Sequence, residues 1–206
     1  MGNEQTRGLL IVLSGPSGTG KGTVVRALLD KRADTVLSVS ATTRAPREGE
    51  IDGVHYHFID QKTFLRLIEE NAFLEYAEYN GNFYGTPKAA AEAQLRAGRN
   101  VVLEIEVQGA GQVMNSGADI LSIFLAVPSM EELERRLRGR GTEDEATIRS
   151  RLALAKEEMK QAFRYQYVVM NDVVEDAVMR IETIIKTENM RYPRMEKTIM
   201  EVIESC

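Results

Sequence analysis

The sequence predicts an α/β fold in which helices cover both faces of a parallel sheet. The first observation is that short apolar, β-branched runs alternate with amphipathic stretches, which is typical of parallel sheets. The second is that a glycine-rich turn directly follows the first apolar run. The third is length, because 206 residues suit one domain with insertions better than two independent domains. The expected strands are residues 9–13, 36–39, 100–105, 120–126 and 167–170.

The first strand leads into the segment GPSGTGKGT at residues 15–23, and a helix is expected over residues 21–33. This strand, turn and helix are typical of a P-loop, in which backbone N–H groups and the helix dipole hold a phosphate. Lys21 adds a positive charge for the outer phosphates. The glycines that allow close approach of the backbone are Gly15, Gly18 and Gly20. The alternative interpretation is a structural turn with a surface lysine.

One position departs from the usual P-loop pattern. Gly22 follows Lys21 where Ser or Thr is usual, and the hydroxyl comes one residue later at Thr23. That hydroxyl commonly ligates Mg²⁺. The direct magnesium ligand is therefore left open at Thr23, and no all-protein metal site is expected.

Two segments interrupt the alternation of strands and helices. Residues 41–85 read as short strands with one helix near residues 62–70, and Asn80-Gly81 is a hairpin signal. Residues 138–147 are charged and glycine-bearing, which suits a mobile flap.

Two later helices have readable starts. Thr86 and Pro87 open one that Gly98 closes. Ser129 and Glu132 form a predicted capping box for the other.

Four blocks resemble the guanylate kinases, P-loop enzymes that pass a phosphoryl group from ATP to GMP. They are GPSGTGKGT, SVSATTRAPREGEIDGVHYHF, FLEYAEYNGNFYGTP and RLRGRGTEDEATIRSRL. They are similar, in order, to the family's P-loop, phosphate grip, guanine reader and lid. The resemblance runs from the P-loop to Asn171. It implies a P-loop NTPase-type core of residues 1–40 and 86–206, an inserted GMP-binding segment of residues 41–85, and a lid at about residues 138–152.

The resemblance also implies that ATP is bound at the P-loop together with Mg²⁺. Because the attacking phosphate oxygen is already ionised at neutral pH, no general base is expected, and catalysis depends on positioning and charge neutralisation. The expected ATP-binding residues are Gly15, Pro16, Ser17, Gly18, Thr19, Gly20, Lys21, Gly22, Thr23 and Asn171. The expected catalytic residues are Lys21, Arg44 and the lid arginines Arg136, Arg140 and Arg151.

A nucleoside monophosphate carries a dianionic phosphate, which guanidinium groups hold bidentately. Guanine offers N1–H and N2–H donors beside the O6 acceptor, so its reader needs a carboxylate and a hydroxyl. The resemblance implies that Glu75 is this carboxylate. It also implies that Thr86 supplies a hydroxyl, at a position where the family usually has serine. The expected GMP-binding residues are Ser40, Arg44, Arg47, Tyr56, Glu75, Tyr84, Thr86, Glu104 and Glu106.

Glu104 and Glu106 lie at the end of the strand NVVLEIE. Carboxylates at the C-terminal end of a parallel strand beside a P-loop can hold Mg²⁺ through water or accept hydrogen bonds from the substrate. The family often has aspartates at these positions. Which of the two glutamates holds Mg²⁺ and which contacts the substrate therefore stays open.

Composition excludes several classes of partner. The net charge of −5 disfavours nucleic acid and anionic membranes, and no apolar run approaches the roughly 20 residues of a membrane span. The single cysteine, Cys206, allows no internal disulfide, so a cytoplasmic location is expected. The tail after Pro193 is amphipathic, and it either caps the fold or forms a homo-oligomer.

Two alternative functions remain. One is a guanylate-kinase-like binding module without catalysis, against which the intact Lys21 and glycine turn argue. The other is a kinase that acts on a different phosphate ester. The guanine-reading residues would distinguish a guanylate kinase from such an enzyme.

Overall fold

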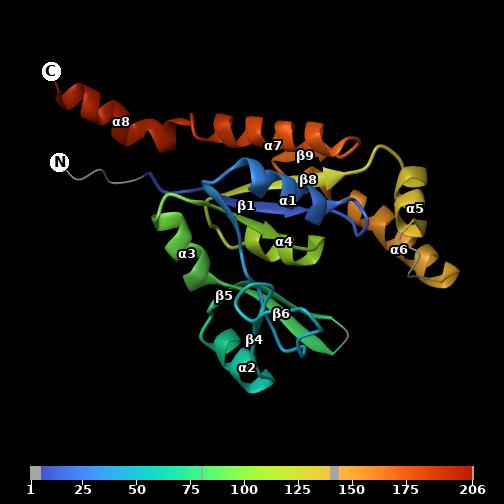
Figure 1. The fold of residues 1–206 in the computed structure, drawn as a ribbon. Coiled ribbons are helices and arrows are strands. Elements are labelled where there is room, and N and C mark those ends of the chain that lie inside the picture. Colours follow the sequence, from blue (N-terminus) through green and yellow to red (C-terminus); the bar gives the residue numbers. More distant parts are fainter. Residues whose placement is uncertain (1–5, 80, 140–143, 206) are drawn as a thin grey trace.

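The computed structural model describes residues 6–79, 81–139 and 144–205. A five-stranded parallel sheet in the order β2-β7-β1-β8-β9 forms its centre, and a four-stranded sheet lies below it in Figure 1. The strands of the large sheet are β1 (Leu10–Ser14), β2 (Thr35–Leu37), β7 (Asn100–Glu104), β8 (Ile120–Ala126) and β9 (Tyr167–Met170). The α/β fold class predicted from the sequence is confirmed.

Alternate residues of the first apolar run pack on opposite faces of this sheet. Leu9, Ile11 and Leu13 join a core cluster with α1 and α7, while Leu10 and Val12 join a second cluster with α3 and α4. Because helices cover both faces, the strand is apolar on both sides and appears as a continuous apolar run. The four covering helices are α1 (Lys21–Lys31), α7 (Val174–Glu188), α3 (Lys88–Arg96) and α4 (Val107–Met114).

Several element ends differ by one or two residues from the sequence prediction: β1 spans Leu10–Ser14 instead of residues 9–13, and β7 ends at Glu104 instead of residue 105. The helix after the P-loop ends at Lys31 rather than at residue 33, because Arg32 has extended backbone angles, φ −127° and ψ 97°. The strand predicted at residues 36–39 pairs with β7 over Thr35–Leu37 instead. Beyond it the chain leaves the large sheet and enters the small one.

The small sheet has the order β4-β3-β6-β5 and its own apolar cluster. Phe64 of α2 is fully buried and stacks on Phe73 and Phe83, with ring centroids 4.5 and 5.4 Å apart. The predicted hairpin is confirmed by antiparallel pairing of Tyr79 with Asn82, although Asn80 lies outside the described residues. The elements are β3 (Ala41–Thr42), β4 (His57–Phe58), α2 (Gln61–Glu69), β5 (Phe73–Tyr79) and β6 (Asn82–Pro87). The division of the chain into domains at residues 40 and 85 stays a prediction.

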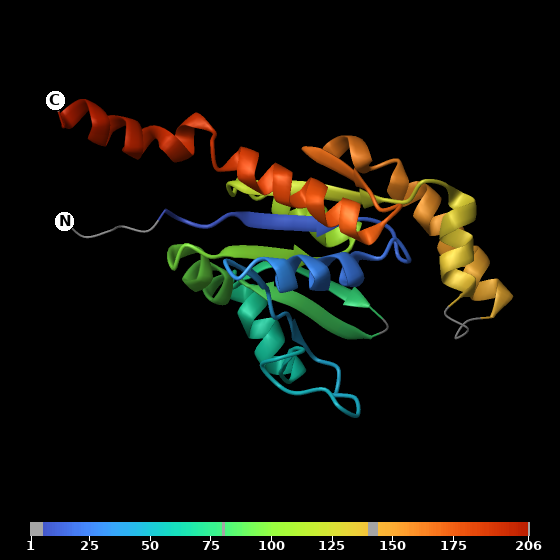
Figure 2. The same cartoon turned by 45° about the horizontal axis from the view of Figure 1, so that its top comes forward.

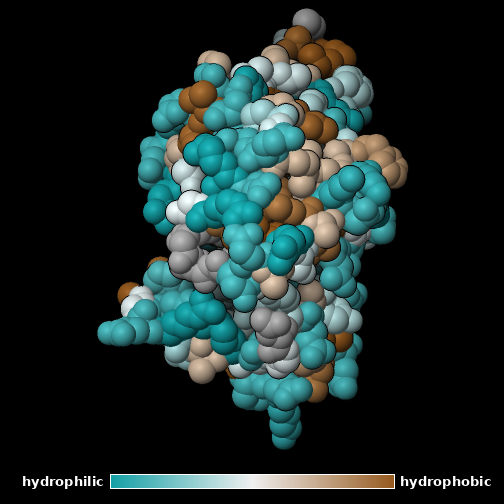
Figure 3. Space-filling view, turned by 90° about the vertical axis from the view of Figure 1, so that its right-hand side faces the viewer, coloured by the Kyte–Doolittle hydropathy of each residue, from teal (hydrophilic) through white to brown (hydrophobic). Residues whose placement is uncertain are grey.

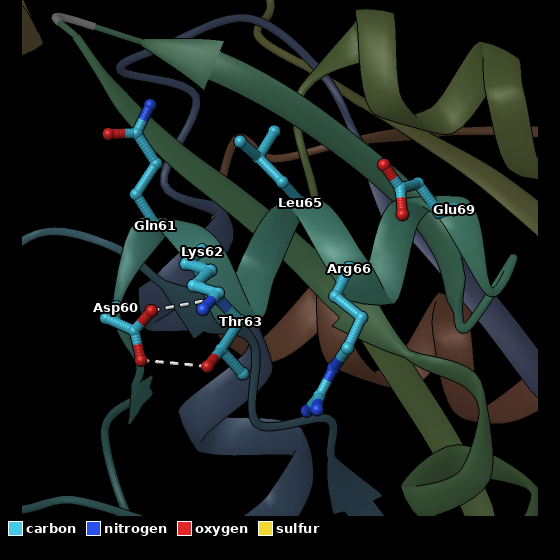
Figure 4. A pocket seen from close by; sticks show the side chains of 7 residues that line it. All are labelled: Asp60, Gln61, Lys62, Thr63, Leu65, Arg66 and Glu69. Carbon is cyan, nitrogen blue, oxygen red and sulfur yellow. Dashed lines mark hydrogen bonds between the residues drawn. The ribbon is translucent and has the colours of Figure 1, made fainter.

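Helix α2 begins at a side-chain cap. Asp60 accepts hydrogen bonds from both the backbone N–H and the hydroxyl of Thr63, each at 2.8 Å (Figure 4). Such a cap satisfies one of the N–H groups that the first helical turn leaves unpaired.

Helices α5 (Met130–Arg138) and α6 (Glu145–Met159) lie at the end of the large sheet opposite the two termini (Figures 1 and 2). Ser129 caps α5 by accepting the N–H of Glu132 at 3.2 Å. The carboxylate of Glu132 binds Arg135 and Arg136, so only the first half of the predicted capping box is seen among the described hydrogen bonds.

The last helix, α8 (Tyr192–Glu204), buries no residue and extends past the sheets (Figure 1). A short 3-10 helix, Ala162–Arg164, precedes β9. Among the described residues, every helix is too short or too polar to span a lipid bilayer.

Candidate active site

The turn between β1 and α1 requires glycine at several positions. Gly15, Gly18 and Gly20 have φ of 148°, 91° and 87°, a region that side chains disfavour. A Cβ at Gly15 would lie 2.2 Å from the carbonyl oxygen of Leu125, and one at Gly20 would lie 2.7 Å from Nδ2 of Asn171. The loop therefore packs tightly against its neighbours.

Lys21, the first residue of α1, bridges this loop. Its Nζ donates hydrogen bonds to the carbonyl oxygens of Gly15 at 2.6 Å and Pro16 at 3.1 Å. Together with the N-terminus of α1 it lines a pocket of about 480 Å³, whose other lining residues are Ser17, Gly18, Gly20, Gly22, Thr23, Arg26, Glu104 and Glu106. Backbone N–H groups, the helix dipole and the lysine make this pocket suited to an anion.

A second pocket of about 400 Å³ lies between the two sheets and shares Lys21, Glu104 and Glu106 with the first. Residues from both sheets line it, among them Ser40, Tyr56, Glu75, Tyr84 and Gly109. Lys21, which is expected to bind ATP, thus lies on the same wall as Glu104 and Glu106, which are expected to bind GMP. The end of the molecule that carries α5 and α6 has a mostly hydrophilic surface (Figure 3).

Glu75 is the one buried residue among the acidic side chains that line the second pocket. Only 7% of Glu75 is exposed, and the hydroxyl of Thr86 donates to its Oε1 at 2.6 Å. Burial raises the pKa of Glu75, and the hydrogen bond from Thr86 opposes this shift. The pairing of β5 with β6 shifts its register between Phe73 and Tyr76. Glu75 lies within this irregular stretch.

Helix α4 fits closely against Glu75. A Cβ at Gly109 would lie 2.7 Å from Oε2 of Glu75. One turn on, the side-chain amide of Gln112 accepts the N–H of Tyr76 at 3.1 Å and donates to its carbonyl at 2.8 Å. Gln112 therefore satisfies both backbone groups of an edge-strand residue and attaches β5 to the large sheet's helical layer.

Arg44 lies in the loop after β3, where several groups surround its guanidinium. Its Cζ lies 5.6 Å from the ring centroid of Tyr56 and 5.8 Å from that of Phe58. Its two terminal nitrogens bind both carboxylate oxygens of Glu50, at 2.9 and 2.8 Å. The hydrogen bonds to Glu50 raise the pKa of Arg44, and Tyr84 adds to the shift. Arg47 is exposed, and its backbone N–H donates to Glu50 at 2.7 Å.

Two of the predicted lid arginines contact the P-loop region. Arg136 donates to the carbonyl oxygens of Thr19 at 3.3 Å and Asn171 at 2.8 Å, and Arg151 donates to the hydroxyl of Ser17 at 3.4 Å. Asn171 is buried and its amide donates to the same Thr19 carbonyl at 2.7 Å. Arg140 lies outside the described residues.

Comparisons with known proteins identify the family of the chain. The guanylate kinase family model matches residues 7–188. A guanylate kinase of Clostridium perfringens (strain SM101 / Type A) is 48% identical over 199 residues, covering 97% of this chain and 92% of that protein. One of Prochlorococcus marinus (strain NATL2A) is 50% identical over 175 residues, covering 85% of this chain and 94% of that protein. The chain belongs to the guanylate kinase family.

A solved structure supports the same assignment of fold. The crystal structure of guanylate kinase from Anaplasma phagocytophilum has a TM-score of 0.75 at 37% identity and covers 96% of this chain and 95% of that chain. The described part of the fold, with its five-stranded sheet and separate smaller sheet, is thus a guanylate kinase fold.

For this guanylate kinase family member, sequence reasoning missed three residues: Glu50, which binds Arg44; Gly109, which packs against Glu75; and Gln112, which binds the backbone of Tyr76. The pattern did hold a signal for Gly109, because Gly109 and Gly111 both lie inside a helix, where glycine is unfavourable unless close packing requires it. Glu50 stands three residues after Arg47, but nothing in that spacing shows which arginine it binds.

Another hollow lies along α2, lined by Asp60, Gln61, Lys62, Thr63, Leu65, Arg66 and Glu69 (Figure 4). These residues all come from α2 and its N-cap, and none belongs to the predicted site. A surface made by one helix alone, without a buried polar group directed into it, gives no indication of a ligand.

Proposed function

We propose that the chain catalyses the guanylate kinase reaction, in which the γ-phosphoryl group of ATP passes to the phosphate of GMP and gives ADP and GDP. The observation that carries this proposal is the wall shared by the two pockets, formed by Lys21, Glu104 and Glu106. Two phosphate-bearing ligands, one in each pocket, would meet beside the charge of Lys21. Close approach of two bound reactants is what phosphoryl transfer needs.

We assign charge neutralisation to the cationic side chains around that wall. Lys21 and the P-loop N–H groups would hold the outer phosphates of ATP, and Arg44 would hold the phosphate of GMP. Arg136 and Arg151 contact the P-loop residues Thr19 and Ser17, and this supports the proposal that their charges act where negative charge shifts during transfer. The acceptor oxygen of GMP is ionised at neutral pH, so no side chain is needed as a general base.

Glu75, Thr86 and Ser40 are proposed to read the base. An ionised Glu75 offers acceptors to the N1–H and N2–H donors of guanine, and Thr86 orients it through the 2.6 Å hydrogen bond. Adenine lacks the N2–H donor, so the buried carboxylate would lose a partner with AMP. Leaving a buried polar group unpaired is how such sites reject an analogue.

The oxygen donors beside the P-loop suit Mg²⁺, which prefers carboxylate, hydroxyl and phosphate oxygens. Thr23, Glu104 and Glu106 line the P-loop pocket, and the missing side chain at Gly22 leaves Oε1 of Glu104 only 3.4 Å from where a Cβ would be. These residues would hold the ion with ATP, directly or through water. When bound, Mg²⁺ supplies positive charge between the outer phosphates of ATP.

The proposal is tested by product analysis with purified protein, ATP and GMP. We expect GDP and ADP to appear in equal amounts, and only when Mg²⁺ is present. GMP binding without any product would favour the binding-module function instead. Product formed equally well from another phosphate ester would favour a kinase of different specificity.

The proposal also covers the parts of the chain that bind each substrate and the compartment in which the reaction takes place. We assign residues 41–85 to the GMP-binding segment and about residues 138–152 to the lid, and we place the reaction in the cytoplasm because the only cysteine, Cys206, allows no internal disulfide. Self-association through α8 stays a prediction, supported by its exposed residues Ile199, Met200, Val202 and Ile203.

Replacing Gly109 with alanine is expected to narrow the preference for GMP over AMP about tenfold, since overpacking of a tight contact typically costs 1–3 kcal/mol. The new Cβ would lie 2.7 Å from Oε2 of Glu75 and would displace the carboxylate from the base. The measurement is kcat/KM for both nucleotides.

Gly111→Ala is the matched control, because a Cβ there would make only an ordinary contact, 3.6 Å from the guanidinium of Arg164. An unchanged preference in Gly109→Ala would show that Glu75 tolerates displacement. An equal change in Gly111→Ala would show a general effect on α4.

A further inference from the structure

Glu50 holds one particular edge of the Arg44 guanidinium. Nη1 and Nη2 of Arg44 bind Oε2 and Oε1 of Glu50 at 2.9 and 2.8 Å, and Nη1 also donates to the carbonyl of Ala45 at 2.7 Å. The side chains of Arg44 and Glu50 are only 15% and 18% exposed. The pair is therefore shielded on most sides.

The remaining hydrogen-bond donors of Arg44 lie on another edge. A guanidinium has five N–H groups in a rigid plane; Glu50 and Ala45 use both hydrogens of Nη1 and one of Nη2. Glu50 leaves Nε–H and the second Nη2–H, which form a second parallel pair suited to a phosphate. The nearby rings of Tyr56 and Phe58 limit rotation of the plane.

Glu50 also binds the backbone of Arg47, in the loop that follows β3. Its Oε2 accepts the N–H of Arg47 at 2.7 Å, and its own N–H donates to the carbonyl of Arg47 at 3.0 Å. The guanidinium of Arg44 and the N–H of Arg47 lower the pKa of Glu50 to about 2. Glu50 is thus ionised throughout the neutral range and keeps both bonds.

We propose that Glu50 is a positioning residue, which fixes Arg44 with its Nε and Nη2 edge turned to the phosphate of the monophosphate substrate. This inference rests on the proposed function, since it takes the phosphate monoester of GMP as the ligand of Arg44. A free arginine side chain loses much rotamer entropy when a ligand fixes it. In this chain Glu50 fixes it beforehand, and such preorganisation strengthens binding.

A carboxylate beside a phosphate site also has an opposing effect, because it repels the dianion. The two effects predict opposite results for Glu50→Gln, which keeps the size but removes the charge. The glutamine NH₂ would face an N–H of Arg44 or of Arg47, whichever way the amide turns. We therefore expect loss of orientation to exceed relief of repulsion.

The test is calorimetric binding of GMP and of guanosine to the full-length protein. We expect Glu50→Gln to raise the Kd of GMP about tenfold, the effect of losing a hydrogen bond to a charged group, and to leave that of guanosine within about twofold. Glu50→Asp keeps the charge but is one methylene shorter, and we expect it also to weaken GMP binding because it cannot span both nitrogens. Glu48→Gln makes the same charge change at an exposed position two residues away and should change neither Kd.

Three outcomes would overturn the inference. Tighter GMP binding by Glu50→Gln would show that Glu50 competes with the phosphate. Unchanged GMP binding would show that Arg44 does not need its partner. Equal weakening for GMP and guanosine, or a lowered Tm in both Glu50 variants, would show a structural role. Wild-type protein that binds GMP yet forms no GDP would contradict the proposed function alone, because this test measures binding and not turnover.

Discussion

Lys21→Ala is expected to lower kcat at least about a hundredfold and to change the Kd of GMP by less than about threefold, as for removal of one group that stabilises transferring charge. Lys21 lies on the wall between the two pockets, and its Nζ is held at the P-loop by the carbonyls of Gly15 and Pro16. Its charge is thus fixed where phosphoryl transfer would occur. Single-turnover kinetics and GMP calorimetry separate the two quantities.

Lys31→Ala is the control for this variant, because Lys31 is an exposed lysine in the last turn of the same helix. It should leave both quantities unchanged. Equal losses of kcat and GMP affinity in Lys21→Ala, or a lowered Tm, would show that the lysine mainly closes the loop. The catalytic assignment would then pass to the arginines.

Glu75→Gln is expected to lower kcat/KM for GMP about 10- to 150-fold, because losing hydrogen bonds to a charged group costs roughly 1.5–3 kcal/mol. Glutamine keeps the shape, but its NH₂ must face either a guanine donor or the hydroxyl of Thr86, which now donates to Glu75. Turnover of AMP, which we expect to be poor in the wild type, should change little. The GMP to AMP preference should therefore narrow.

Glu70→Gln makes the same chemical change on the surface, where Glu70 pairs with Arg66 at 3.8 Å. Such exposed pairs contribute little, so its kcat/KM values should equal those of the wild type. If Glu75→Gln kept the full preference for GMP, Glu75 would not face the base, while the phosphate contacts would still stand.

The pH dependence of GMP binding gives an independent view of Glu75. Because burial raises the pKa of Glu75 above its ordinary value of 4.5, the carboxylate takes up a proton at a higher pH than an exposed glutamate does. A protonated Glu75 loses acceptor capacity, so the wild type should lose GMP affinity on acidification before pH 4.5 is reached. Glu75→Gln should lack this part of the profile, whereas protonation of the GMP phosphate would affect both proteins alike.

The sequence predicted the parts of this protein that follow from local rules. Strand β8 lies at the predicted residues, because an apolar run buried on both faces has few other solutions. Strand β9 also lies at the predicted residues, although Val168 and Met170 of this edge strand are exposed. The P-loop was predictable because positive φ and close packing at Gly15 leave only glycine possible there. The predicted residues Ser40, Tyr56, Glu75 and Tyr84 line one pocket, although their roles toward a ligand stay predictions.

What the sequence did not predict depends on contacts between distant segments. The fit of Gly109 against Glu75 joins α4 to β5, and no spacing rule relates the two. Glu132 binds Arg136 rather than completing a cap, because an arginine one turn away competes with the backbone N–H. Glu50 binds Arg44 rather than standing exposed, since only the folded loop brings them together.

The most direct measurement of the central claim is kcat/KM for phosphoryl transfer from ATP to GMP, AMP, dTMP and UMP, followed by ADP release with Mg²⁺ present. The shared wall of the two pockets and the buried Glu75 predict that GMP is preferred over each of the others by at least about a hundredfold, as expected when a site built to hydrogen-bond its substrate meets an analogue. Comparable values for GMP and any other nucleotide would contradict the account of base recognition. The absence of magnesium-dependent ADP with all four would contradict the assignment of phosphoryl transfer itself.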